Sequence, residues 1–324
     1  MKNLRSILTS LGIAAIASIW TTAAAAADYP TKPITIIMPF ATGGGFDVTA
    51  RALARGMQAE LGQPVIVENK TGASGTIGAN FVRQAPADGY TLLMGTTNLL
   101  SFPRSVMPGR AYDPQADFVP ISGLSRSDLV LIVPESSPAR NMQDLVALAR
   151  RNPGKLSYGS YGTATTTHFC IEELKRLTKT HLVHVPYRGA PTLDVVGGQL
   201  DVSCDVIPAV LPLARAGRLR ILGVAAPTRS TFLPEVPTVA EQGFADFSVF
   251  TWSGLVVRKG TPADVTEKLT KVVAKVARDA EFQTQLRNLS TEAWLPTPAE
   301  LTAFIGTETA KWQKLVIEAQ IKLD

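Results

Sequence analysis

The sequence predicts an α/β protein of two lobes, in which each lobe is a doubly wound sheet with flanking helices. Strand-like and helix-like segments alternate along the chain, as they do where helices connect the strands of a parallel sheet. The alternation restarts after Leu124, and a proline-rich segment after Ala226 marks a return to the first lobe. We therefore expect residues 27–124 with 227–324 to form lobe 1, and residues 125–226 to form lobe 2.

The first lobe shows the β-α-β-α-β order most clearly. The segment ITIIMPF (34–40) is apolar throughout, which is typical of a buried parallel strand. The next segment, from Asp47 to Leu61, keeps apolar residues at helical spacing, and Asp47 is placed to cap it. Two further strands are predicted at 64–69 and 91–95, with a helix over 75–86 between them.

The rest of the chain continues in strands and helices. In lobe 2 we predict strands at 129–134, 155–160, 182–187, 200–206 and 219–226, and helices at 141–153, 167–177 and 208–217. Lobe 1 is completed by a strand at 253–260 and helices at 261–279, 280–290 and 297–320. In the last helix, apolar residues from Leu301 to Ala319 form one stripe, which predicts a packing face.

Residues 1–26 have the features of a cleavable secretory signal peptide. Lys2 and Arg5 precede an apolar stretch, and an alanine-rich run with Ala-x-Ala cleavage choices follows it. The stretch is shorter than the roughly 20 residues of a membrane span, which argues against a retained anchor. No cysteine lies at the cleavage site, so we do not expect a lipoprotein.

Charge and cysteine content exclude several classes of function. The net charge is +5, and the basic residues are scattered, which fits an anionic solute better than a nucleic acid. The two cysteines, Cys170 and Cys204, are interpreted as small buried apolar residues without a functional role, although export makes a disulfide chemically possible. No Cys-x-x-Cys motif or histidine cluster suggests a metal, and we expect no cofactor.

The known enzyme motifs that involve glycine do not fit. Gly45 is followed by Phe46 and Asp47 instead of Lys and Ser or Thr, so the segment is not a phosphate-binding P-loop. The serine-hydrolase motif G-x-S-x-G is absent, and the sequence shows no base–nucleophile pair. We therefore expect no enzyme, and the sequence argues against an exported hydrolase.

Three loops share a design that favours binding of an anion. PFATGGGFD, NKTGASGTIG and YGSYGTATTTH each join a strand end to a helix start through small and hydroxyl residues. The first N–H groups of a helix are unpaired and carry partial positive charge, and glycine lets a ligand approach them closely. Each loop alone could be an ordinary helix cap. Three of them together indicate a site that holds an anion without lysine or arginine.

These loops resemble those of the tripartite tricarboxylate transporter solute-binding proteins, the Bug or TctC family. The matching stretches include YPTKPITIIMPFATGGGFDVTAR, ENKTGASGTIGANFVRQAPADGYTLLMGT, KLSYGSYGTATTTHF and HVPYRGAPTLDVVGGQLDVSCD, in family order. The resemblance implies a periplasmic, two-lobed binding protein of type II architecture with a ligand cleft between the lobes. It also implies a small carboxylate as ligand and a two-component membrane permease as partner, and we expect a monomer.

The resemblance also implies which residues bind the ligand. Carried over one by one, they are Phe40, Thr42, Gly43, Gly44, Asp47, Gly72, Ala73, Ser74, Gly75, Thr96, Thr97, Ser160, Gly162, Thr163, His168, Tyr187, Gly189 and Asp205. The chain departs from the family in the first loop, which has Ala-Thr-Gly-Gly-Gly where Ala-Gly-Gly is commoner. It departs again at Ala164 and Thr165, where Gly-Ser is commoner. Both departures leave the identity of the ligand open.

Several alternatives stay open at this point. Asp47 is either a helix cap or a contact to the ligand, and His168 is either a satisfied helix-start residue or a donor to the carboxylate. Among basic residues, Arg51 and Arg188 are nearest to the loops in sequence, and Arg51 should point away. The ligand is a di- or tricarboxylate or an aromatic carboxylate. A sensor that presents the bound carboxylate to a signalling partner is the alternative to transport.

Overall fold

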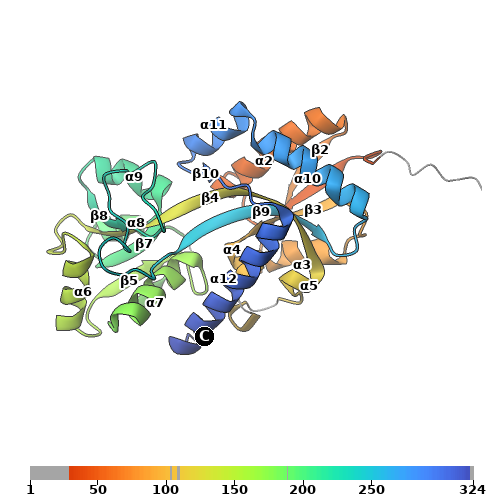
Figure 1. Ribbon diagram of the computed structural model, residues 1–324. Coiled ribbons are helices and arrows are strands. Elements are labelled where there is room, and N and C mark those ends of the chain that lie inside the picture. The colour runs from red at the N-terminus through yellow and green to blue at the C-terminus, as the bar shows by residue number, and fades with distance from the viewer. Residues whose placement is uncertain (1–28, 103, 108–109, 188, 322–324) are drawn as a thin grey trace, which may run out of the picture. The chain divides into compact units, whose positions relative to one another are not determined.

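The computed structural model describes residues 29–102, 104–107, 110–187 and 189–321 (Figure 1). The elements given below belong to the unit that begins at Lys32. The predicted signal peptide and Arg188 lie outside the described residues. Within the described part of the chain, no helix combines the length and the hydropathy that a membrane span requires.

One long sheet holds all the strands that the described residues form. Its order is β2-β1-β3-β9-β4-β7-β5-β6, and β8 and β10 also pair with β4. The strands are β1 (Ile34–Met38), β2 (Val65–Asn69), β3 (Thr91–Thr96), β4 (Phe118–Pro134), β5 (Ser157–Ser160), β6 (Val183–Pro186), β7 (Val202–Val206), β8 (Leu219–Val224), β9 (Phe250–Arg258) and β10 (Glu292–Ala293).

Strand β4 joins two halves of this sheet. From Phe118 to Asp128 it pairs antiparallel with β9, and beyond that point it pairs with β7 and β8. We call β2, β1, β3 and β9 the first half, and β8, β7, β5 and β6 the second half. Figure 1 shows β4 and β9 as long neighbouring strands, and β4 continues from the first half into the second. The partner of β4 changes between Asp128 and Leu129, whereas the predicted lobe boundary is at Leu124, and that boundary stays a prediction.

The predicted α/β class is confirmed. In each half the short strands are parallel, β2-β1-β3 in the first and β6-β5-β7 in the second, and helices connect them. The longer helices are α2 (Gly45–Leu61), α3 (Thr76–Gln84), α6 (Met142–Arg151), α7 (Thr166–Thr178), α9 (Ile207–Arg215), α10 (Ala263–Ala277), α11 (Ala280–Asn288) and α12 (Pro298–Glu318). Short helices include α4 (Thr97–Ser101), α5 (Pro114–Asp117) and α8 (Thr192–Val196).

The start of β4 was not predicted. The expected strand began at Leu129, but the structure extends it back to Phe118. The register against β9 shifts between Pro120 and Ser122 and again between Gly123 and Ser125. Proline and glycine are typical of such bulges, which break the regular alternation that reveals a strand in the sequence.

Helix α12 holds the first half of the sheet against α7. Its predicted apolar stripe is confirmed, because Leu301, Ile305, Trp312 and other stripe residues are buried. Trp312 packs against Phe102 and Phe169, with ring centroids 5.6 Å away in each case. Burial of aromatic and aliphatic side chains on this scale is the main favourable term in folding.

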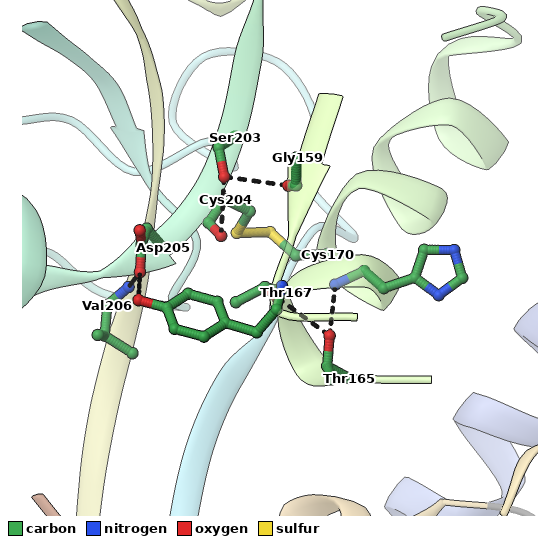
Figure 2. Close-up of a disulfide and its surroundings, with 10 residues drawn as sticks. Gly159, Thr165, Thr167, Cys170, Ser203, Cys204, Asp205 and Val206 are labelled. Carbon is green, nitrogen blue, oxygen red and sulfur yellow. Dashed lines mark hydrogen bonds between the residues drawn. A yellow bond between two sulfur atoms is a disulfide. The ribbon is translucent and has the colours of Figure 1, made fainter. Parts of the chain in front are cut away.

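Cys170 and Cys204 are fully buried, as interpreted from the sequence, and they form the disulfide whose presence the sequence had left open (Figure 2). Cys170 lies on α7 and Cys204 on β7, with their Cα atoms 6.2 Å apart, within the range that a disulfide spans. This pairing could not be predicted from the sequence, because only the packing of α7 on β7 brings the two residues together. The bond ties the helix to the strand.

We expect the double substitution Cys170→Ser with Cys204→Ser to lower the free energy of unfolding by about 2–4 kcal/mol, because the bond closes a loop of more than 30 residues in the unfolded chain. Denaturant unfolding monitored by circular dichroism measures this. Unfolding of the unmodified protein with a reductant should give the value of the variant. Equal stability of variant and oxidised protein would contradict the prediction.

Candidate functional site

The first predicted loop is held by Asp47. The N-cap of α2 is Gly44, and Asp47 lies in the first turn of the helix. The prediction that Asp47 caps this helix was therefore wrong. Its carboxylate accepts hydrogen bonds from the backbone N–H of Gly43 at 3.0 Å and from the side chains of Arg51 and Asn69. Burial raises the pKa of Asp47, but the bonds from Arg51, Gly43 and Asn69 outweigh it, so the pKa is lowered overall. Asp47 thus shapes the loop, and Arg51 is engaged with it.

The second loop has an unusual backbone. Gly72, Ala73, Ser74 and Gly75 are consecutive, and all four have positive φ angles, between 46° and 120°. Such angles are uncommon for residues other than glycine and cost free energy, so they persist only where the surroundings impose them. A Cβ on Gly72 would also lie 2.6 Å from the side chain of Ile77. The Asn98 side chain donates to the Ser74 carbonyl oxygen at 3.3 Å and holds the loop in place.

The third loop satisfies much of its own backbone. The N–H groups of Tyr161, Gly162 and Ala164 donate to the side chains of Thr167, Ser160 and His168, respectively. Thr165 is the N-cap of α7 and accepts from the backbone N–H of His168. These bonds pair the loop backbone with nearby side chains, and Thr165, Thr166 and Thr167 stand at the start of the helix.

A cavity of about 560 Å³ lies where the three loops meet strands β4 and β9. It is lined by Phe40, Gly45, Phe46, Thr49, Ser74, Asn98, Ser125, Ser127, Leu129, Tyr161, Thr165, Thr166, Thr167, Val206, Pro208, Thr251, Leu289 and Thr291. The starts of α2 and α7 therefore face one cavity from the two halves. None of these described residues carries a charge at neutral pH.

Two of the predicted binding residues, Phe40 and Ser74, line this cavity. Most of the others lie next to the wall or behind it: Thr42, Gly43, Gly44 and Asp47 before and in the first turn of α2, Gly72, Ala73 and Gly75 around Ser74, Thr96 and Thr97 beside Asn98, and Ser160, Gly162, Thr163 and His168 around the start of α7. Tyr187 and Gly189 are not among the lining residues, and the Tyr187 hydroxyl donates to Asp194. Ligand binding by these residues remains a prediction.

Asp205 supports the wall from behind. It is fully buried and accepts hydrogen bonds from the hydroxyls of Tyr161 and Thr192. It also accepts one from the N–H of Val206, which Figure 2 shows beside it. Burial raises the pKa of this carboxyl, although the three hydrogen bonds favour its ionised form. Since Tyr161 and Val206 both line the cavity, Asp205 acts on the site through them.

Several lining residues were not predicted. Ser125, Ser127 and Leu129 come from β4, and Thr251 comes from β9. Residues two apart on a strand share a face, so the alternation in LSRSDL signals that Ser125 and Ser127 point the same way. That signal was missed because the segment was not recognised as a strand. Gly45 and Phe46 were also not predicted, because the family resemblance implied only Gly43 and Gly44 among the glycines of this loop.

A buried ring stack lies behind the third loop. His168 stacks on His184 with ring centroids 4.1 Å apart, and Tyr158 stacks on His184 at 4.8 Å. Glu172 accepts from Tyr158 and from Lys175, and lies 3.8 Å from the His168 ring. Burial lowers the pKa of His168 to about 3, with further contributions from His184 and Lys175. Burial also lowers the pKa of His184.

The stack contains a serine–histidine pair that the sequence did not reveal. The Ser160 hydroxyl lies 2.7 Å from Nε2 of His184. Ser160 is fully buried, however, and it does not line the cavity. Its hydroxyl also bonds the Gly162 carbonyl oxygen at 3.0 Å. The pair therefore orders the third loop, and its serine is not exposed to a substrate.

A family model described as the tripartite tricarboxylate transporter family receptor, TctC, matches residues 49–321. Among solved structures, Rpa4515 of R. palustris with adipate is similar, with 33% identity, a TM-score of 0.80 and coverage of 91% of this chain and 99% of that one. MatC of Rhodopseudomonas palustris with bound malate has 30% identity, a TM-score of 0.76 and coverage of 89% and 100%. The periplasmic binding protein BugD has 32% identity, a TM-score of 0.76 and coverage of 91% and 99%.

We expect the stability of the fold to fall below neutral pH because of His168. Between pH 6.5, its ordinary pKa, and the folded value of about 3, the unfolded chain binds a proton that the folded chain does not. From pH 7 to 5 this histidine should therefore remove about 2 kcal/mol from the free energy of unfolding. Asparagine keeps an acceptor for the Ala164 N–H but does not titrate, so His168→Asn should lose that part of the decrease.

Denaturant unfolding at pH 7 and pH 5 measures the difference. His181→Asn is the matched control, because His181 is exposed and its side chain is outside the stack. That variant should keep the pH dependence of the unmodified protein. An equal decrease in the His168→Asn variant would show that His168 does not resist protonation.

Proposed function

Because the chain belongs to the tripartite tricarboxylate transporter receptor family, TctC, we propose that it is a periplasmic binding protein that captures a small carboxylate and delivers it to a two-component membrane permease. The fold is the two-lobed type II architecture of these proteins, with the ligand cleft between the lobes. Family members are solute-binding receptors. The capture of a carboxylate by this chain, its delivery and its periplasmic location are what we propose.

The main support for this proposal is a cavity that faces two helix starts and has an uncharged wall. Gly45 and Phe46 are the first two residues of α2, and Thr166 and Thr167 are the first two of α7. The N–H groups at a helix start have no acceptor within the helix, and they favour an anion. Hydrogen bonds to a charged group contribute about 1.5–3 kcal/mol each, so a few of them account for useful affinity.

The rest of the wall fits a small organic molecule. The volume of the cavity, about 560 Å³, is within the range of roughly 300–1,000 Å³ that is common for small-molecule sites. The lining includes both hydroxyl residues and the apolar side chains of Phe40, Phe46, Leu129, Val206, Pro208 and Leu289. Such a wall suits the carbon skeleton of an aliphatic or aromatic carboxylate. The carboxylates in the adipate and malate complexes of similar proteins support the same ligand class.

The binding proposal is tested by thermal unfolding with succinate, malate, adipate, citrate, benzoate and 4-hydroxybenzoate. A ligand present at 100 times its dissociation constant stabilises the fold by about 2.7 kcal/mol, which raises the unfolding temperature measurably. Benzamide and succinamide are the uncharged controls. No stabilisation by any carboxylate, or equal stabilisation by the amides, would argue against an anion site.

Gly45→Val should weaken binding of the best carboxylate at least tenfold, because the new side chain fills space in front of the α2 N–H groups. A Cβ at Gly45 meets no atom within 4 Å, so the fold should tolerate the change. Gly45→Ala should have a smaller effect. Isothermal titration measures both affinities.

Gly306→Val is the matched control, since it adds the same side chain to a helix outside the cavity. Its affinity should equal that of the unmodified protein. Unchanged affinity in Gly45→Val, with the fold intact by circular dichroism, would place the anion elsewhere.

A further inference from the structure

Ser127 lies in the wall of the cavity at the point where β4 and β9 run side by side. Ser127 as a whole is 8% exposed, and its hydroxyl has no hydrogen-bond partner among the described residues. A buried polar group without a partner costs about 1–3 kcal/mol, so native proteins seldom leave one unpaired. Ser127 lines the cavity although its hydroxyl oxygen has almost no accessible surface, so the side chain must turn toward the cavity for a bound ligand to supply the missing partner.

The neighbouring hydroxyls on the same face are already engaged. Ser125, two residues earlier on β4, bonds its cross-strand neighbour Ser253 at 2.6 Å. Thr251 is the cross-strand neighbour of Ser127, but its hydroxyl lies 3.4 Å from that of Thr97. Thr97 also accepts from the backbone N–H of Trp252. The protein therefore satisfies the hydroxyls around Ser127 and leaves this one free.

The charges near Ser127 cancel each other away from the cavity. Arg126 and Asp128 flank it on β4 and are absent from the cavity wall. They form an ion pair at 2.9 Å, and the guanidinium of Arg126 lies over the ring of Phe250. A second carboxylate at this position would find one hydroxyl and no cation. A neutral group needs only the hydroxyl.

We infer that the bound solute carries an uncharged hydroxyl or carbonyl group that hydrogen-bonds to Ser127, apart from the carboxylate. This inference rests on the proposed function. The site then recognises the ligand at two points. The starts of α2 and α7 bind the carboxylate, and Ser127 of β4 binds a neutral substituent. Ser127 is accordingly a specificity-determining residue.

The test compares carboxylates that differ by one hydroxyl: succinate with malate, benzoate with 3- and 4-hydroxybenzoate, and hexanoate with 6-hydroxyhexanoate. In the unmodified protein, the tightest binder should be a hydroxylated member, about tenfold tighter than its parent. In Ser127→Ala that preference should disappear, while the parent compound keeps its affinity within about twofold. Isothermal titration supplies the dissociation constants.

Ser122→Ala is the matched control. Ser122 is also a buried serine of β4, but its hydroxyl donates to the Gly123 carbonyl oxygen and it is outside the cavity wall. It should lose stability and keep the preference for the hydroxylated ligand. Ser127→Ala without ligand should be at least as stable as the unmodified protein, because no protein hydrogen bond is lost and an unpaired buried hydroxyl is removed.

The outcomes separate the two proposals. If no carboxylate binds the unmodified protein, the proposed function fails, and this inference fails with it. If carboxylates bind but the parents are preferred in every pair, only this inference is overturned. The same holds if Ser127→Ala keeps the preference, since the hydroxyl would then hold only water.

Discussion

The backbone pairing of β4 is the interaction on which both halves of the sheet depend. One strand of 17 residues pairs with β9 along its first part and with β7 and β8 along its second. Because the change of partner falls between Asp128 and Leu129, the residues around it lie at the boundary between the halves. The three described residues of this stretch that face the cavity, Ser125, Ser127 and Leu129, are spaced by two. The pleat of one strand therefore supplies a wall to which loops from both halves are added.

The loops meet their structural demands in different ways. The first relies on a buried carboxylate, Asp47, that binds Arg51, Asn69 and a loop N–H. The third relies on neutral side chains, with His168 as acceptor and Ser160 between His184 and Gly162. The second shows consecutive left-handed residues that include Ala73 and Ser74. Asp47, Ser160 and His168 hold their loops without lining the cavity, whereas Asn98, Thr165 and Thr167 do both.

This partial separation explains how far the sequence was predictive. Strand and helix periodicity predicted the α/β class, because burial repeats every two residues in strands and every three to four in helices. The loops were located for the same reason, since they follow strand ends. Periodicity does not tell which residue of a loop faces the ligand, so Gly44 was named and Gly45 was not. It also does not reveal the Cys170–Cys204 pairing, because contacts between α7 and β7 arise only from tertiary packing.

The uncharged wall has a consequence for the proton balance of binding. The acidic and basic side chains nearby, among them Asp47, His168, Asp205 and the Arg126–Asp128 pair, are outside the wall and bonded within the protein. Burial raises the pKa of Tyr161, the titratable side chain among the described lining residues, so it stays protonated at neutral pH. An anion that enters therefore meets no group that exchanges a proton with it. On the proposed function, binding and release of the carboxylate then need no proton transfer to or from the described lining side chains.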